Sequence, residues 1–163
     1  YGEHMNITII SVGKIKEKFF TDAIKEYKKR LSRFCRLTEK IILDERADEG
    51  FSQSEIEQAK IKEGIKILDK TPKASYVFAL DIRGEQLSSK ELAKKIDTLA
   101  IDGRPDIAFI IGGSNGLSHD VLNAADFRLS FSKMTFPHQL FKVILMEQIY
   151  RAFKIISGET YHK

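Results

Sequence analysis

The chain has little of several residue types on which other classes of protein depend. It contains one cysteine, Cys35, three prolines and no tryptophan among 163 residues. A single cysteine excludes an intramolecular disulfide and any zinc site built from several cysteines. No apolar run approaches the roughly 20 residues that cross a bilayer, and no stretch resembles a signal peptide. These absences predict a cytoplasmic protein without a membrane span or a metal site.

The motifs of the common nucleotide sites are missing as well. Neither G-x-G-x-x-G nor G-x-x-x-x-G-K-[ST] occurs, which disfavours a Rossmann dinucleotide site, a P-loop and the glycine-rich loop of Rossmann-type methyltransferases. No zinc-finger, homeodomain or RNP signature marks a standard nucleic-acid module. Cys35 is predicted to lie on an amphipathic helix, where a packing role is favoured over a catalytic thiol.

Charge is distributed unevenly along the chain, whose formal net charge is +4. Residues 14–40 carry ten Lys or Arg against four acids, whereas residues 44–57 carry six acids against Arg46. Basic blocks favour a polyanionic partner, although a solvated helix face explains a lysine-rich run as well. The acidic segment has no assigned role.

Apolar periodicity alternates between that of strands and that of helices. The expected strands are 6–12, 37–43, 75–81, 107–111 and 127–131. The expected helices are about 20–34, 54–70, 88–101, 118–125 and 137–157, with Ser54 and Glu57 forming a capping box. This alternation predicts one α/β domain over 5–163, with a mostly parallel sheet of five to six strands and helices on both faces. Residues 1–4 are expected to be a cloning remnant before Met5.

The last of these helices is apolar around nearly its whole circumference, so it must be covered on all sides. Its apolar residues are Leu140, Phe141, Val143, Ile144, Leu145, Ile149, Tyr150, Phe153, Ile155 and Ile156. A second copy of the chain covers the outer face most simply, which predicts a two-fold homodimer. Complete burial within one chain is the other explanation.

Three of the expected strands end in segments that suit a ligand, because parallel sheets bind ligands at the carboxyl ends of their strands. These segments contain Leu80, Gly112 with Gly113, and residues 131–136. The two glycines let a ligand approach the backbone or permit a positive φ, unless packing alone requires them. Main-chain groups beside Met134 and Phe136 suit a flat heteroaromatic ring.

The chain ends in a polar segment beyond the last helix. Such a tail is normally disordered. Tyr161, His162 and Lys163 nevertheless supply a stacking face, a titratable imidazole and a cation within three residues. A functional tail would use them against a base and its phosphates.

Several segments carry a resemblance to a known family. IGGSNG (111–116), LSFSKMTFPHQ (129–139), YRAFKI (150–155) and YHK (161–163), with the opening SVGKIKEKF (11–19), resemble the RlmH family. These are SPOUT-class, S-adenosylmethionine-dependent methyltransferases that act on N3 of a pseudouridine in 23S ribosomal RNA. The resemblance covers essentially all of 5–163. It implies an obligate homodimer with the cofactor near its interface, a carboxyl-terminal deep trefoil knot, and the assembled ribosome as substrate.

The resemblance also implies roles for individual residues. The expected cofactor-binding residues are Leu80, Gly112, Gly113, Phe131, Ser132, Lys133, Met134, Thr135 and Phe136. The expected catalytic residues are Arg151, Tyr161 and His162, and the expected substrate-binding residues are His138, Arg151 and Lys163. The imide N3 must lose its proton, so His162 is a candidate base and Arg151 a candidate partner of the anion or of a phosphate. Neither a metal nor a nucleophilic cysteine is required.

Two other functions compete with this one. A non-catalytic protein that binds RNA or the ribosome would use the basic face and the tail without affinity for S-adenosylmethionine. A methyltransferase of the same fold could act on tRNA instead. The short chain lacks separate tRNA-binding extensions, which favours the ribosomal substrate.

Overall fold

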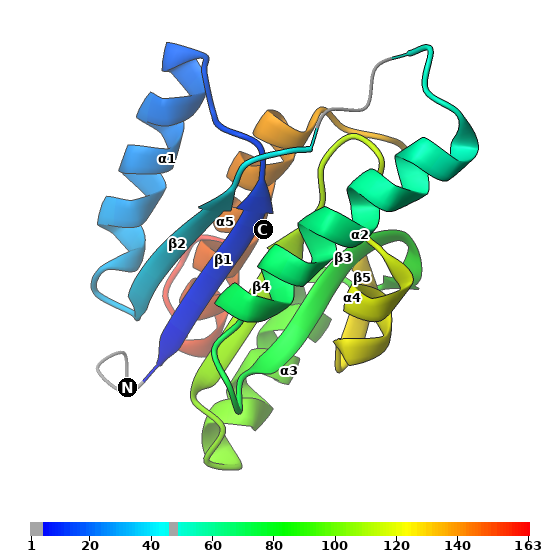
Figure 1. The fold of residues 1–163 in the computed structure, drawn as a ribbon. Helices are drawn as coiled ribbons and strands as arrows, with labels where there is room; N and C mark the ends of the chain where they lie inside the picture. The colour runs from blue at the N-terminus through cyan, green and yellow to red at the C-terminus, as the bar shows by residue number, and fades with distance from the viewer. Residues whose placement is uncertain (1–4, 46–48) are drawn as a thin grey trace.

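Five parallel strands form the centre of the molecule (Figure 1). The computed structural model describes residues 5–45 and 49–163, so the expected cloning remnant lies outside the described residues. The strand order is β2-β1-β4-β3-β5 and every neighbouring pair is parallel. The strands are Asn6–Val12 (β1), Arg36–Ile42 (β2), Tyr76–Gln86 (β3), Asp106–Ile111 (β4) and Phe127–Ser130 (β5). The predicted α/β class with a parallel sheet is confirmed.

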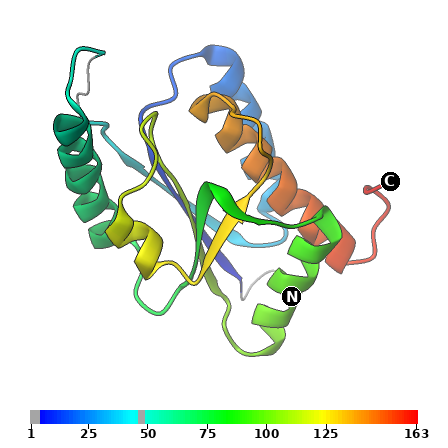
Figure 2. The same ribbon diagram turned by 90° about the vertical axis from the view of Figure 1, so that its right-hand side faces the viewer.

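Helices cover both faces of this sheet (Figure 2). One face packs against Lys18–Leu31 (α1), Ser89–Ile101 (α3) and His138–Ile156 (α5), and the other against Gln53–Lys70 (α2) and His119–Ala124 (α4). Successive strand residues point to opposite faces. Ile9 therefore belongs to the core under α5, and Ile10 to the core under α2.

Side-chain caps fix the start of three helices. Ser88 and Glu91 form the capping box of α3, and the Ser118 hydroxyl accepts a hydrogen bond from Val121 at the start of α4. The predicted box at the start of α2 is wrong by two residues, because Ser52 with Glu55 forms it. Both serines precede a glutamate by three residues, so the motif alone does not distinguish them.

The turn after α1 corrects the expectation for the single cysteine. The helix ends at Leu31, so Cys35 lies in the turn before β2 and not on the helix. Its side chain is buried, and burial raises the pKa of the Cys35 thiol to about 12. The predicted packing role is confirmed, since a thiol so hard to ionise is a poor nucleophile.

Strand β3 runs five residues beyond its predicted end. Gly84 was expected to follow the strand, but it lies inside it at a shift of register between Leu80 and Glu85. A Cβ on Gly84 would lie 2.5 Å from the carbonyl oxygen of Arg128. Glycine therefore lets β3 and β5 approach each other at the bulge.

Helix α5 is packed between the sheet, α1 and α3. Its buried residues are Lys142, Leu145, Met146, Ile149, Tyr150, Ala152 and Phe153. Lys142 is 1% exposed and forms an ion pair with Glu39 of β2, which also pairs with Lys28 of α1. Much of the apolar circumference is thus covered within one chain, while Leu140 is exposed. The trefoil knot stays a prediction.

No helix of the described residues is both long enough and apolar enough to span a membrane.

Candidate active site

A cleft of about 750 Å³ opens at the ends of β4 and β5 and beside the bulge of β3. A volume of this order is typical of small-molecule sites. Residues 80–83, 111–117 and most of 128–136 line it, together with side chains from the starts of α2, α4 and α5. The three predicted segments converge there, but the first lies at the bulge within β3 and not at the end of that strand.

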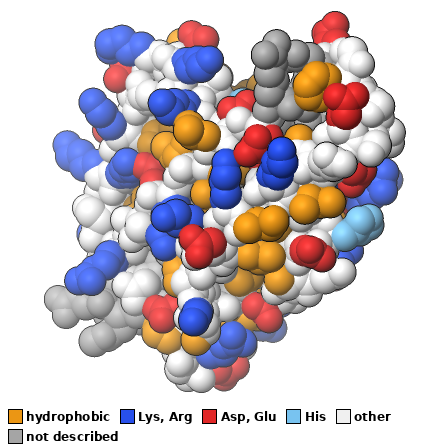
Figure 3. Space-filling model, viewed as in Figure 1, with side chains coloured by type: hydrophobic (Ala, Val, Ile, Leu, Met, Phe, Trp, Pro, Cys, Tyr) orange, Lys and Arg blue, Asp and Glu red, His pale blue; other side chains and the backbone are white. Residues whose placement is uncertain are grey.

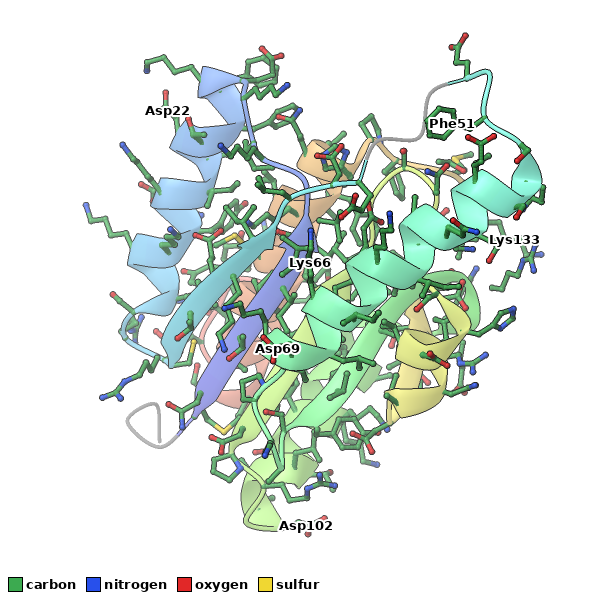
Figure 4. The ribbon with its side chains drawn as sticks, in the orientation of Figure 1. Asp22, Phe51, Lys66, Asp69, Asp102 and Lys133 are labelled. Atoms are coloured by element: carbon green, nitrogen blue, oxygen red, sulfur yellow. The ribbon has the colours of Figure 1, made fainter. Side chains whose placement is uncertain are left out.

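Eight of the nine predicted cofactor residues line this cleft. They are Leu80, Gly112, Gly113, Phe131, Ser132, Met134, Thr135 and Phe136. The ninth, Lys133, is exposed and lies at the outside of its loop (Figure 4), so its side chain is not part of the cleft wall. Sequence position alone could not separate Lys133 from its neighbours, because the loop has no regular alternation.

The loop between β5 and α5 leaves its main chain available to a ligand. Within the described part of the chain, no main-chain group of residues 132–136 bonds another main-chain group. Ser132 steadies the loop through its hydroxyl, which accepts from the N–H of Met134 at 3.0 Å. Phe131 and Phe136 both contact the ring of Phe141, with centroids 5.0 and 6.1 Å apart. Apart from the Met134 N–H and the Ser132 carbonyl, which accepts from the Ser130 hydroxyl, the amides and carbonyls of this loop are open to a ligand beside aromatic walls, which suits an adenine ring.

Packing explains why two glycines follow β4. A Cβ on Gly112 would lie 2.9 Å from the carbonyl carbon of Gly116, and one on Gly113 would lie 3.1 Å from Val12 Cγ1. Neither glycine has a positive φ, which occurs instead at Gly116, at 83°. The loop therefore closes tightly on itself, and its backbone forms the floor of the cleft.

His138 lies where α5 begins at the edge of the cleft. Its Nε2 is buried and has no hydrogen-bond partner among the described residues. A Cβ on Gly13 would lie 3.0 Å from this nitrogen, and Gly13 also has a φ of 96°. The N–H of Lys16 donates to Gln139 Oε1 at 3.1 Å, so the β1–α1 loop is fixed to the first turn of α5. The expected substrate contact of His138 stays a prediction.

The predicted catalytic residues lie together, but away from the cleft. Arg151 Nη1 is 3.2 Å from His162 Nδ1, and the guanidinium lies 4.7 Å from the centre of the Tyr161 ring. Thirteen residues of helix separate Arg151 from His138, which corresponds to about 20 Å along α5. Figure 2 shows the tail on the side of α5 that faces away from the sheet. Lys163 is exposed at its end.

Two buried or half-buried charges on α5 were missed in the sequence. Glu147 bonds both Arg151 and Tyr161, and its spacing of four residues before Arg151 is the one signal that could have indicated it. Lys142 gave no signal, since it stands between apolar neighbours. Burial raises the pKa of its partner Glu39, but hydrogen bonds from Lys142 and Lys28 outweigh that effect and hold the pKa below its ordinary value.

Among the described residues, no group of three or more His, Cys, Asp or Glu side chains is arranged to hold a metal ion.

A parallel α/β sheet with a cleft at one edge, and a loop of mostly unbonded main-chain groups in that cleft, is typical of α/β proteins that bind small molecules. A family model described as "Predicted SPOUT methyltransferase" matches residues 5–162. The chain therefore belongs to the SPOUT methyltransferases, which use S-adenosylmethionine.

Curated relatives and solved structures agree with this assignment. Proteins from Clostridium beijerinckii and Clostridioides difficile, each named ribosomal RNA large subunit methyltransferase H, are 57% identical over 159 residues, 98% of this chain and 100% of each relative. The structure of a methylase family protein from Neisseria gonorrhoeae aligns with a TM-score of 0.57 at 15% identity, over 98% of this chain and 87% of that one. A methylase family protein from Haemophilus influenzae gives 0.53 at 14% identity, over 99% and 71%. These two structures support the fold alone.

Proposed function

We propose that this methyltransferase acts on N3 of a pseudouridine in 23S ribosomal RNA within the assembled ribosome. The observation that carries the proposal is the identity of 57% to relatives named for the large-subunit ribosomal RNA, extending over 98% of this chain. Lys and Arg side chains gather over α1 (Figure 3), where Lys25 and Lys29 are exposed. Such a surface suits a phosphate backbone. A ribosomal substrate implies a cytoplasmic enzyme.

The cleft residues fit S-adenosylmethionine. Leu80, Phe131 and Phe136 would hold the adenine between apolar side chains, while the remaining unbonded main-chain groups of 132–136 would bond its ring nitrogens and the ribose. The bound cofactor supplies an electrophilic methyl group on a sulfonium sulfur. The protein must therefore orient N3 in line with that methyl group and favour loss of the N3 proton.

The one cysteine argues for a nitrogen target over a carbon target. Methylation at carbon 5 of a uridine requires an attacking thiolate. Cys35 is buried in the turn after α1, does not line the cleft, and has a pKa of about 12. Direct transfer to N3 needs no covalent bond between the enzyme and the base, so this chain has what that reaction requires.

A homodimer would bring the tail of one copy to the cleft of another. Within one chain the cleft and the Arg151 cluster lie about 20 Å apart along α5. Phe19 near the start of α1, Met134 in the cleft loop and Leu140 in the first turn of α5 are 66%, 75% and 37% exposed. These apolar side chains suit contact with a second copy. In an isologous dimer, the tail of each copy would lie at the cleft of the other, which gives two equivalent sites.

Mixed dimers test this arrangement. Gly112→Val weakens cofactor binding in the cleft and Arg151→Ala removes a side chain of the tail, so at a cofactor concentration well below the Kd each variant alone should lose at least about 10-fold in rate. A dimer containing one chain of each retains an intact cleft from one copy and an intact tail from the other. Recovery of a substantial fraction of the wild-type rate supports exchange between copies. A mixed dimer no faster than the two single variants would place the cleft and the tail of the same chain in one site.

The substrate is tested with ribosomes from a strain that lacks the modification. Purified protein and S-adenosylmethionine are added to intact ribosomes, isolated large subunits, protein-free 23S RNA and bulk tRNA, and the methylated nucleotide is mapped by mass spectrometry. We expect a single N3-methylated pseudouridine in 23S RNA, with intact ribosomes as the best substrate. Methylation of tRNA would overturn the proposal. Ribosome binding without cofactor binding in calorimetry would instead indicate a non-catalytic RNA-binding protein.

A further inference from the structure

One carboxylate holds the carboxyl-terminal cluster together. Glu147 Oε1 accepts from Arg151 Nε at 2.8 Å and lies 2.6 Å from Arg151 Nη2. The hydroxyl of Tyr161 donates to Glu147 Oε2 at 3.5 Å. The Glu147 side chain is 19% exposed and that of Arg151 is 24% exposed, so water competes weakly for these bonds. Glu147 thus fixes the orientation of the Arg151 guanidinium and of the Tyr161 ring that stacks on it.

The contact between Arg151 and His162 determines which nitrogen of the imidazole carries its proton. A guanidinium has N–H donors and no acceptor. Nδ1 of His162, 3.2 Å from Arg151 Nη1, must therefore be the acceptor. The imidazole is then neutral, and its proton lies on Nε2. In this state the Nε2–H group of His162 can donate a hydrogen bond to a ligand. Its unprotonated nitrogen, Nδ1, already accepts from Arg151.

The other charged groups around this cluster leave that assignment intact. Arg30 of α1 lies over the ring of Tyr150, 5.7 Å from its centre, and adds a further positive charge beside the tail. Lys154 and Glu159 form a pair with each other at 3.2 Å. Glu147 directs its two oxygens to Arg151 and Tyr161, so the partner that the structure gives to the His162 ring is Arg151.

We propose that Glu147 is a positioning residue that orders Arg151 and Tyr161, and that the tail so ordered presents His162 as a neutral hydrogen-bond donor through Nε2–H. The inference rests on the proposed function, because the acceptor is an imide oxygen of the target base. When N3 loses its proton to water, the negative charge spreads to the two flanking carbonyl oxygens. A donor there stabilises the anion while the N3–CH3 bond forms and the bond from sulfur to that carbon breaks. His162 then takes no proton from N3.

Substitutions of His162 separate a donor from a base. The side-chain amide of glutamine places an N–H near the position of Nε2 but accepts no proton at neutral pH. We expect His162→Gln to keep kcat within about 10-fold of wild type, and His162→Ala to lose at least about 100-fold. Equal losses in the two variants would overturn the donor role and restore His162 as the base.

Substitutions of Glu147 test the positioning role. We expect Glu147→Gln to lower kcat at least about 10-fold with the KM for ribosomes and the affinity for cofactor within about twofold, and Glu147→Asp to recover part of the loss. Glu26→Gln is the matched control, because Glu26 forms the same kind of pair with Arg30, at 2.8 Å, on α1. An unchanged kcat in Glu147→Gln, or an equal loss in the control, contradicts the proposal.

Nitrogen NMR of the free, full-length protein with labelled histidine tests the tautomer without any RNA. We expect the His162 signals, assigned with His162→Gln, to show an unprotonated Nδ1 and a protonated Nε2, and this preference to weaken in Glu147→Gln and Arg151→Lys. A protonated Nδ1 in the wild type would overturn the inference. If wild-type protein methylates no ribosomal RNA, the proposed function fails, while the NMR result still decides whether Glu147 orders the tail.

Discussion

The two ends of α5 are built in opposite ways. At its amino end, most main-chain groups of the loop 132–136 have no hydrogen-bond partner among the described residues, and Met134 is 75% exposed. At its carboxyl end, Glu147, Arg151 and Tyr161 are joined to one another through their side chains. A site made of main-chain groups depends on the path of the backbone, whereas a site made of side chains depends on their identity. The cleft should therefore tolerate many substitutions that the tail does not.

The largest effect is expected at the tail. Arg151→Ala removes a cation and leaves Glu147 and His162 without their partner, so kcat should fall at least about 100-fold. Cofactor affinity, measured by calorimetry, should stay within about twofold, because Arg151 does not line the cleft. Arg104→Ala, an exposed arginine before β4, is the control and should keep full activity. A comparable loss of cofactor affinity would show that the cleft at one end of α5 and the side-chain cluster at the other do not act independently.

The buried ion pair of Lys142 with Glu39 lies between the two ends of α5, and the next substitution tests how much this pair stabilises the fold. Lys142→Met should lower the free energy of unfolding by about 2 kcal/mol at pH 7, less than for a fully isolated buried charge because Lys28 still pairs with Glu39. Urea unfolding measures this. The pairs hold the pKa of Glu39 below its ordinary 4.5. The two ion pairs therefore stabilise the fold fully above pH 4.5. This stabilisation is lost as the pH falls through the lowered pKa of Glu39.

The difference in the free energy of unfolding between wild type and Lys142→Met should accordingly become smaller below about pH 4.5. Lys18→Met is the matched control, since Lys18 pairs with Asp22 at 2.7 Å on the surface and its side chain is 87% exposed. That substitution should leave the unfolding midpoint unchanged. A gap that stays constant with pH would mean that Glu39 is not the group whose charge Lys142 balances.

A smaller effect is expected from the glycine loop in the cleft. Gly112→Val should weaken cofactor binding about 10-fold, because its Cβ has no room beside the Gly116 backbone, 2.9 Å away. Gly50→Val provides the comparison, as nothing lies within 4 Å of a Cβ there. Calorimetry with S-adenosylmethionine measures both. Equal affinity in the two variants would indicate that the loop yields without disturbing the cleft floor.

The smallest effect is expected within the cofactor loop itself. Lys133→Ala should change the cofactor affinity less than about twofold, since the exposed Lys133 side chain does not line the cleft. Its main-chain groups are unaffected by the substitution. A larger loss would mean that the ammonium reaches the ligand after all, and the contrast between main-chain and side-chain recognition would weaken.

The sequence predicted the parallel sheet and the convergence of its strand ends, because both follow from local periodicity and from where glycines interrupt it. It misplaced the start of α2, since Ser52 and Ser54 carry the same motif. It missed the bulge at Gly84, which depends on the distance between β3 and β5. It could not reveal that Glu39 faces Lys142, because 103 residues separate a pair that only the packed fold brings together.

The tail was the least predictable part of the site. Residues 161–163 have no periodicity, and composition favoured a disordered end. The order of Tyr161 and His162 comes from Glu147 and Arg151 on the preceding helix, and that contact requires the chain to reverse after Gly158, where φ is 72°. The family resemblance named these residues, but their grouping around one carboxylate is a property of the three-dimensional structure.

The buried Cys35 provides a built-in chemical probe of local unfolding at the turn between α1 and β2. A thiol with a pKa of about 12 stays protonated at pH 8, so a small disulfide reagent cannot react with it in the closed state. Once the turn between α1 and β2 opens, the thiol meets water and ionises near its ordinary value of 9.0. The labelling rate therefore counts openings of this turn, without any introduced probe. Loss of Lys142, which pairs with Glu39 of β2, should increase the labelling rate of Cys35.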